Sequence, residues 1–231
     1  MIMEPHHAFV RKIFSHTAPS YDCMVALTTM GQDTSWKRKM ITIVQTHEGP
    51  RSILDMACGT GILTYLLAKT FPESHITAID LQEEYIQQAE EKKSNLGIDN
   101  VSFHVMSAES VCEGAYDIIT ASYLPKYVNM EVIISTCAHI LNPGGILIFH
   151  DFIYPENFLF KMLYNGYWIL LKPLLWLHRD WREMSRELRS YIVQTHWIKD
   201  IYRALRSNQF EDITVEIQKF QIAAIVSARK K

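Results

Sequence analysis

Two carboxylates and a pair of glycines are spaced as the binding of a nucleoside-like ligand requires. Asp55 stands four residues before Gly59 in the stretch 53–61, ILDMACGTG. Gly59 and Gly61 permit a tight turn and let a ligand approach bare backbone. Asp80 follows 19 positions after Gly61, the usual reach of one helix plus one strand. An acidic residue at the end of a second strand accepts hydrogen bonds from ribose hydroxyls, although a simple helix N-cap is the alternative.

The glycine pattern also separates two classes of cofactor. A dinucleotide fingerprint, GxGxxG, needs a third glycine, and Thr64 stands at that position. The carboxylate of Asp55 is placed to bind, directly or through water, the ammonium of a methionine group, and no pyrophosphate has to be accommodated. The sequence therefore favours a cofactor that joins a nucleoside to methionine.

The elements that must position these residues alternate from residue 52 onward. The pattern predicts strands at 52–57, 75–80, 101–106, 115–121 and 146–149, with helices at 61–71, 83–95 and 130–140. Helices at 4–17 and 34–47 precede them, an Asn-Pro-Gly-Gly turn occupies 142–145, and strands at 214–220 and 221–228 close the chain. Such alternation predicts a parallel sheet with helices on both faces. Ligands bind beyond the carboxyl ends of such strands, where Asp55 and Asp80 lie.

The alternation of strands and helices ends after Asp151. Residues 155–206 are predicted to be mostly helical and are rich in aromatic side chains. Residues 158–177 are long enough to span a bilayer, but Lys161, Asn165, Lys172 and Pro173 interrupt them. We expect an element that covers the substrate or touches a membrane, with an ordinary helical cap as the alternative. One domain is expected: a helical lid (1–48), a cofactor-binding core (50–151), a substrate-covering insertion (152–206) and closing strands (207–231).

The composition limits the partners. Among 231 residues, 48% are hydrophobic and 21% charged, and the net charge is −2, so no basic field attracts nucleic acid. The 4 cysteines lack CxxC or zinc-ligand spacing, which predicts reduced thiols and no metal site. The first residues lack the apolar core of a signal peptide. We expect a cytoplasmic protein, peripheral at a membrane if the aromatic insertion touches one, and leave the oligomeric state open.

Four motifs together, LDMACGTGILT, AIDLQ, YDIITASYL and LNPGGILIF, resemble the class I S-adenosylmethionine-dependent methyltransferases over roughly residues 50–150. The resemblance implies a Rossmann-like α/β fold with a seven-stranded, mostly parallel sheet and a helical insertion after the fifth strand. It also implies S-adenosylmethionine as cofactor. The implied cofactor-binding residues are Asp55, Ala57, Gly59, Thr60 and Gly61 at the methionine end, Asp80 and Leu81 at the ribose and adenine, Ser107, Ala108 and Glu109 at the adenine rim, and Tyr21 and Ser122 nearby. Many members have an acidic residue where this chain has Ser107. The serine hydroxyl can still accept a hydrogen bond from the adenine amino group.

A narrower resemblance lies near the N-terminus. Phe14, Ala18, Tyr21 and Asp22 in FSHTAPSYD, followed by Trp36 and Lys37, resemble the quinone-biosynthesis C-methyltransferases. These enzymes methylate demethylmenaquinol or a ubiquinone precursor, which implies a lipid-like small-molecule acceptor. The chain departs from that family at Val25, where an asparagine is usual, at residues 139–142 before the Pro-Gly-Gly turn, and at residues 122–127, where an arginine-asparagine pair is usual.

Methylation of a phenol or quinol needs a general base, because loss of the hydroxyl proton makes the ring nucleophilic. We expect His150 and Asp151 to supply it, since they follow the fifth strand; a structural role for His150 is the alternative. Tyr21 and Tyr123 are expected to face the sulfonium or the substrate, and His16 is a further candidate.

Other classes stay open. A methyltransferase acting on oxygen, nitrogen or sulfur of another small molecule is the main alternative, followed by a non-catalytic protein that binds S-adenosylmethionine. Thr64 disfavours a nicotinamide dehydrogenase. Ser122-Tyr123-Leu124-Pro125 does not match the Pro-Pro-Tyr element of DNA methyltransferases.

Overall fold

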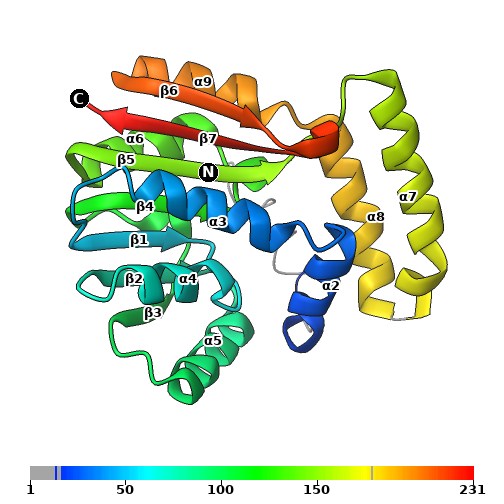
Figure 1. The fold of residues 1–231 in the computed structure, drawn as a ribbon, viewed down its shortest axis with the longest axis horizontal. Coiled ribbons are helices and arrows are strands. Elements are labelled where there is room, and N and C mark those ends of the chain that lie inside the picture. Colours follow the sequence, from blue (N-terminus) through cyan, green and yellow to red (C-terminus); the bar gives the residue numbers. More distant parts are fainter. Residues whose placement is uncertain (1–13, 15–16, 178) are drawn as a thin grey trace.

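One seven-stranded sheet organises the molecule. The computed structural model describes Phe14, residues 17–177 and residues 179–231. The strand order is β3-β2-β1-β4-β5-β7-β6 (Figure 1). The strands are β1 (Ser52–Met56), β2 (His75–Asp80), β3 (Val101–Val105), β4 (Tyr116–Ser122), β5 (Leu141–Phe152), β6 (Phe210–Ile217) and β7 (Ala223–Lys230). The first five are parallel, and β7 lies antiparallel between β5 and β6. The expected Rossmann-like, mostly parallel sheet is confirmed.

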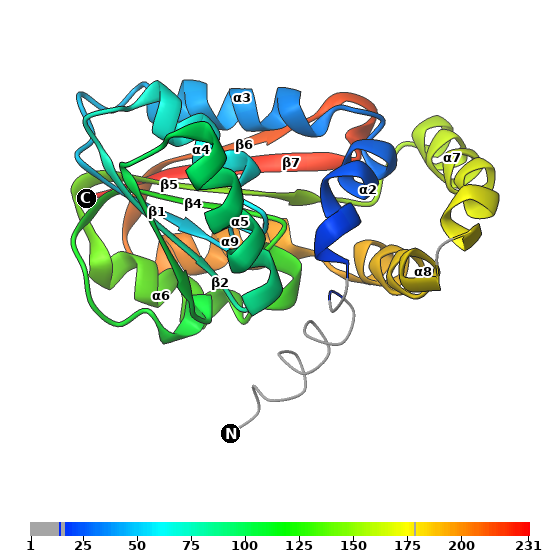
Figure 2. The same cartoon turned by 90° about the horizontal axis from the view of Figure 1, so that it is seen from below.

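Helices cover both faces of this sheet (Figure 2). Alternate residues of a strand point to opposite faces, so Ile53 and Leu54 of β1 belong to different cores. The Ile53 face packs against α3 (Asp33–Val44), α4 (Ile62–Thr70) and α5 (Glu83–Leu96). The Leu54 face packs against α6 (Met130–Ile140) and α9 (Trp197–Ser207). Two-sided burial explains why the strands read as nearly continuous apolar runs.

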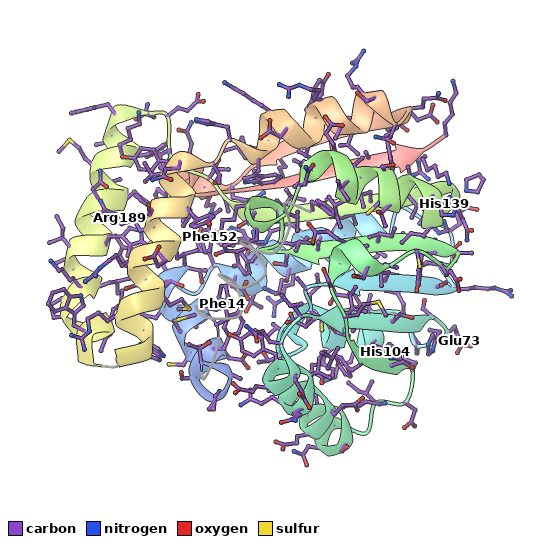
Figure 3. All side chains as sticks on the ribbon, turned by 180° about the vertical axis from the view of Figure 1, so that it is seen from behind. Phe14, Glu73, His104, His139, Phe152 and Arg189 are labelled. Atoms are coloured by element: carbon purple, nitrogen blue, oxygen red, sulfur yellow. The ribbon has the colours of Figure 1, made fainter. Side chains whose placement is uncertain are left out.

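A third apolar cluster lies beyond the carboxyl ends of the strands. It joins α2 (Tyr21–Thr28), α7 (Phe158–Leu177) and α8 (Arg179–Gln194) to the end of β5. Trp36, Phe152, Trp168 and Met184 are buried there. Figure 3 shows Phe152 and Phe14 at this end of the sheet, with Glu73 and His139 at the other. Of the expected insertion, only α7 and α8 stand off the sheet, because α9 packs on α6 and β6.

Three details of the predicted elements differ. The turn expected at 142–145 lies inside the bounds of β5 as an irregularity: pairing with β4 passes from Leu141 opposite Tyr116 to Ile146 opposite Ile118, and Gly144 has φ of 76°. The strand predicted at 214–220 starts earlier, at Phe210, and ends at Ile217. Phe220 and Gln221, with φ of 61° and 54°, make the turn into β7 instead. The helix expected at 4–17, apart from Phe14 and Thr17, and the candidate His16 lie outside the described residues.

The described helices, α7 included, contain no stretch that is both long and apolar enough to cross a membrane.

Candidate active site

The turns after β1, β2, β3 and β4 meet at one pocket, here called the main pocket. It brings together ten of the expected residues: Tyr21, Ala57, Gly59, Asp80, Leu81, Ser107, Ala108, Glu109, Ser122 and Tyr123. Phe14, Met106 and Tyr127 add apolar surface to its wall. A pocket that is mostly apolar with a few convergent polar groups is the usual form of a small-molecule site.

A smaller cavity, here called the loop pocket, adjoins it. Tyr21, Ala57, Gly59, Ser122 and Tyr123 line both cavities, so they form the boundary between them. Asp55, Thr60 and Lys37 line the loop pocket only. The expected residues therefore divide between two adjoining spaces, as a long two-part ligand requires.

Gly61 lines neither cavity. It is the N-cap of α4 with φ of 85°, and a Cβ there would come within 2.6 Å of the Tyr65 ring. A glycine is needed at this position because the turn is left-handed and the Tyr65 ring packs against it.

Asp80 presents a buried carboxylate to the main pocket. Its oxygens accept hydrogen bonds from the backbone N–H groups of Gly59, at 2.9 Å, and Gln82, at 2.8 Å. Burial raises the pKa of Asp80 to about 6. A carboxylate has about four lone-pair sites, so it keeps acceptor capacity for ligand hydroxyls. Leu81, Met106 and Ala108 line the same pocket and add apolar surface beside this carboxylate.

Asp55 is held by two threonines. Thr64 Oγ1 donates to one carboxylate oxygen at 2.6 Å, and Thr120 Oγ1 donates to the other at 2.8 Å. Burial raises the pKa of Asp55 to about 6, while these hydrogen bonds act in the opposite direction. Thr64, which replaces the third glycine of a dinucleotide fingerprint, thus has a defined structural task.

The loop between β1 and α4 is tied to the N-terminal helix. Ala57 and Gly59 adopt φ of 53° and 57°, so the backbone turns sharply here. Thr60 Oγ1 donates to Asp22 at 2.5 Å, and Lys92 forms an ion pair with the same carboxylate at 2.6 Å. A Cβ at position 59 would lie 3.6 Å from the Tyr21 ring. Helix α2 therefore closes over this loop.

A mostly parallel sheet, a left-handed glycine turn after β1 and a buried carboxylate at the end of β2 define a class I S-adenosylmethionine-dependent methyltransferase. The described residues fit that cofactor, since one pocket offers a carboxylate beside an apolar slot and the other a carboxylate beside the glycine turn. The chain belongs to the ubiE/COQ5 methyltransferase family, whose model matches residues 2–209.

Curated relatives and solved structures agree with this placement. The chain is 24% identical over 226 residues to the ubiquinone/menaquinone biosynthesis C-methyltransferase UbiE of Geobacter sulfurreducens, covering 96% of this chain and 88% of the relative. It is 27% identical to the demethylmenaquinone methyltransferase of Thermus thermophilus, covering 71% and 74%. In structure it is similar to geranyl diphosphate C-methyltransferase from Streptomyces coelicolor A3(2), with a TM-score of 0.62, 12% identity, and coverage of 86% and 79%. The structural likeness concerns the fold alone.

Tyr123 is the expected catalytic residue that lines both cavities. Its backbone is left-handed, with φ of 65°, and strain of this kind persists where the surroundings over-determine it. Its hydroxyl donates to Asp33 at 2.7 Å, and its ring stacks on Phe152 with centroids 4.9 Å apart. Burial and the Asp33 carboxylate raise the pKa of Tyr123 well above its usual value, so the phenol stays protonated.

Asp33 and Lys37 form a buried ion pair beside Tyr123. The Lys37 ammonium lies 5.0 Å from the centroid of the Tyr123 ring. Sequence reasoning missed Asp33 and assigned Lys37 no chemistry. The available signal was their i,i+4 spacing around Trp36.

His150 is fully buried and lines neither cavity. Its Nδ1 lies 3.0 Å from Ser122 Oγ, while Nε2 has no hydrogen-bond partner. Burial lowers the pKa of His150 well below its usual value, so the ring is neutral. Its role as the base stays a prediction.

Asp151 also lines neither cavity, and it forms an ion pair with Lys126 in which both side chains are 0% exposed. Its oxygens also accept the backbone N–H groups of Phe152, at 2.7 Å, and Lys126, at 3.2 Å. Lys126, which the sequence did not single out, lies 5.7 Å from the Tyr123 ring centroid. These contacts indicate that Asp151 holds Lys126 and the backbone at Phe152 in place.

Replacing Asp80 by asparagine should weaken S-adenosylmethionine binding about ten- to hundredfold, because hydrogen bonds to charged groups contribute about 1.5–3 kcal/mol. The wild-type affinity should also fall as the pH drops below about 6, where Asp80 takes up a proton. Calorimetric titration at several pH values measures both effects. An unchanged dissociation constant in the variant would show that Asp80 does not hold the ribose.

Proposed function

We propose that the protein transfers a methyl group to a ring carbon of a prenylated quinol. The observation that supports this most is the hydrogen bond from Tyr123 to Asp33 at the wall shared by the two cavities. It offers a route for the proton that a hydroxylated ring must lose. The relatives in Geobacter sulfurreducens and Thermus thermophilus are named for quinone methylation.

The two cavities divide the cofactor between them. In this proposal Asp80, Leu81, Ser107, Ala108 and Glu109 hold the adenosine end in the main pocket. Asp55 and Thr60 hold the methionine end in the loop pocket, with Ala57 and Gly59 between them. When bound, S-adenosylmethionine supplies an electrophilic methyl group on a positively charged sulfur. Tyr21 and Tyr123, on the boundary, face the reacting centre.

The chain's own part in the chemistry is the removal of a proton. The quinol hydroxyl gives its proton to the Tyr123 oxygen, while the Tyr123 proton passes along the 2.7 Å hydrogen bond to Asp33. The electron pair of the broken O–H bond enters the ring and makes the neighbouring carbon nucleophilic. Once that carbon carries the methyl group, it loses its own proton to solvent, the electron pair of this C–H bond restores the aromatic ring, and the ring oxygen regains a proton from Asp33 through Tyr123. Tyr123 stays neutral throughout, which agrees with its raised pKa. Lys37, paired with Asp33, keeps that carboxylate oriented.

His150 and Asp151 have supporting tasks in this proposal. His150 orients Ser122 through the Nδ1 contact. Asp151 fixes Lys126 behind the Tyr123 ring. Helix α2, together with α7 and α8 of the insertion, covers the acceptor and excludes water.

The assay uses purified protein, labelled S-adenosylmethionine and reduced demethylmenaquinone in detergent. We expect a product methylated on ring carbon, identified by mass fragmentation. A methyl group on the quinol oxygen would instead support the O-methyltransferase alternative. No transfer to the quinol at all would reject the proposed acceptor.

We further propose that α7 contacts a membrane surface. Phe158, Ile169 and Leu170 are exposed by 76%, 69% and 78%, which is unusual for large apolar side chains. Lys172 and Arg182, on α7 and α8, lie beside the exposed ring of Trp176 at 4.8 and 5.8 Å. Apolar side chains beside cations match the surface of anionic lipids.

This contact predicts lipid-dependent sedimentation. The protein should sediment with vesicles that contain phosphatidylserine and much less with neutral vesicles. Ile169→Glu should weaken this binding, whereas Val132→Glu, at an exposed apolar position on α6, should not. Equal loss in both variants, or no sedimentation of the wild type, would reject the contact.

A further inference from the structure

A third cavity, here called the tail groove, lies between α7, the end of α2 and the turn that precedes β7. Its walls include Met30, Phe152, Leu163, Trp168 and Phe220. None of the described side chains that line it carries a charge. Tyr167, a further lining residue, donates its hydroxyl to the Leu27 carbonyl and so ties α7 to α2. A concave surface without charge excludes ionic ligands and suits a hydrocarbon chain.

The inner end of the tail groove is next to the reacting centre. Phe152 lines the groove, and its ring stacks on Tyr123 with centroids 4.9 Å apart and planes at 21°. Tyr123 lines the main pocket. Two stacked rings therefore form the partition between the groove and the space where the acceptor ring must react.

The outer end lies along the exposed face of α7. Met162, Leu163 and Leu170 line the groove and are also exposed by 56%, 51% and 78%. Phe160 and Phe220, with centroids 6.1 Å apart, join α7 to the turn that precedes β7 along this wall. The groove thus offers apolar side chains from Phe152 to the molecular surface.

We propose that the tail groove binds the isoprenoid tail of the acceptor while the ring reacts beside Tyr123. This inference rests on the proposed function, since a tailed quinol is the acceptor assumed. The groove gives the enzyme a reason to prefer tailed over tail-less rings, because each carbon removed from water adds to the binding.

Gly166 provides a substitution that tests the groove with little risk to the fold. It lines the groove from the middle of α7, and a Cβ built there meets nothing within 4 Å. Leucine and alanine both favour a helix over glycine, so neither should destabilise α7. Gly166→Leu fills the groove, and Gly166→Ala is the matched control that leaves it open.

The first measurement is equilibrium binding of tritiated geranylgeraniol, an isoprenoid alcohol without a quinol ring, to the full chain. We expect the wild type and Gly166→Ala to bind equally and Gly166→Leu to bind about tenfold more weakly, since its side chain takes the place of several chain carbons. Equal binding by all three, or no binding by the wild type, would overturn the proposal. This readout does not depend on methyl transfer, so it stands even if the quinol proves not to be the acceptor.

The second measurement compares the methylation of a tailed and a tail-less demethylnaphthoquinol. In Gly166→Leu, KM for the tailed compound should rise about tenfold while KM for the tail-less one stays the same. An equal rise for both would place the effect at the ring site and overturn the tail assignment. Transfer to neither compound by the wild type would instead reject the proposed function.

Discussion

Tyr123→Phe should lower kcat about 10²–10⁴-fold and leave KM for the quinol nearly unchanged. The variant keeps the ring and its stacking on Phe152, and it removes only the hydroxyl that bonds to Asp33. Positioned proton transfer contributes about this range of rate. Because Asp33 keeps its ion pair with Lys37, the unfolding free energy should drop by only about 1 kcal/mol. Steady-state kinetics and urea unfolding measure the two quantities.

Tyr65→Phe is the matched control for this change. Its hydroxyl donates to the Ala89 carbonyl, away from both cavities. It loses a comparable hydrogen bond and should retain wild-type turnover. If Tyr123→Phe also turned over at the wild-type rate, the proton route through Asp33 would be wrong, and His150 would return as the first candidate for the base.

Asp151→Ala should lower the unfolding free energy by about 3–5 kcal/mol, since it strands the buried ammonium of Lys126 without its partner. The same substitution also leaves the backbone N–H groups of Phe152 and Lys126 without their hydrogen-bond acceptor. The midpoint of urea unfolding should therefore shift strongly. Turnover should fall in proportion to the fraction of protein that is unfolded, and the folded fraction should stay active.

The double variant Lys126→Met with Asp151→Leu separates charge from position. Replacing both partners by apolar side chains of similar size removes the stranded ammonium, so most of the stability should return. If the double variant stays folded and turns over near the wild-type rate, Asp151 is not the base. A folded double variant without turnover would contradict a purely structural role for this pair.

Much of the core of the fold could be predicted because its pattern is local. The strand at 75–80 and the helix at 130–140 were predicted with the boundaries that β2 and α6 have. Both combine a clear apolar period with an obvious boundary, such as Asn129, whose side chain caps α6. Asp55 and Asp80 were singled out by the same logic, since parallel strands place their carboxyl ends together, whereas residues such as Thr60 and Ala108 came from the family resemblance.

The closing strands were predicted less well for a physical reason. In β6, Glu211 has low strand propensity, and pairing with Arg229 of β7 holds it in the strand. Asp212, which follows it, adopts a left-handed φ of 51° inside the register shift. Phe220 and Gln221 read as strand residues, yet their left-handed backbone makes the turn. Such tertiary effects leave no periodic signal.

Charged residues of the site were missed because charge normally indicates exposure. Asp33, Lys37 and Lys126 are buried only because each has an opposite charge within reach. Asp33 and Lys37 are neighbours on one helix, whereas Lys126 and Asp151 come from separate elements that only the fold brings together. The first pair could have been found from the sequence, and the second could not.

The outermost strand, β6, bears on how the protein behaves at high concentration. An edge strand offers unpaired amides to the sheet of a second molecule, which is a common start of aggregation. Along this edge Glu211, Asp212 and Glu216 carry negative charge, and the register shifts between Glu211 and Thr214 where Asp212 turns left-handed. A charged, irregular edge presents a poor template for further strands. The sequence of β6 therefore favours solubility at high concentration as well as pairing with β7.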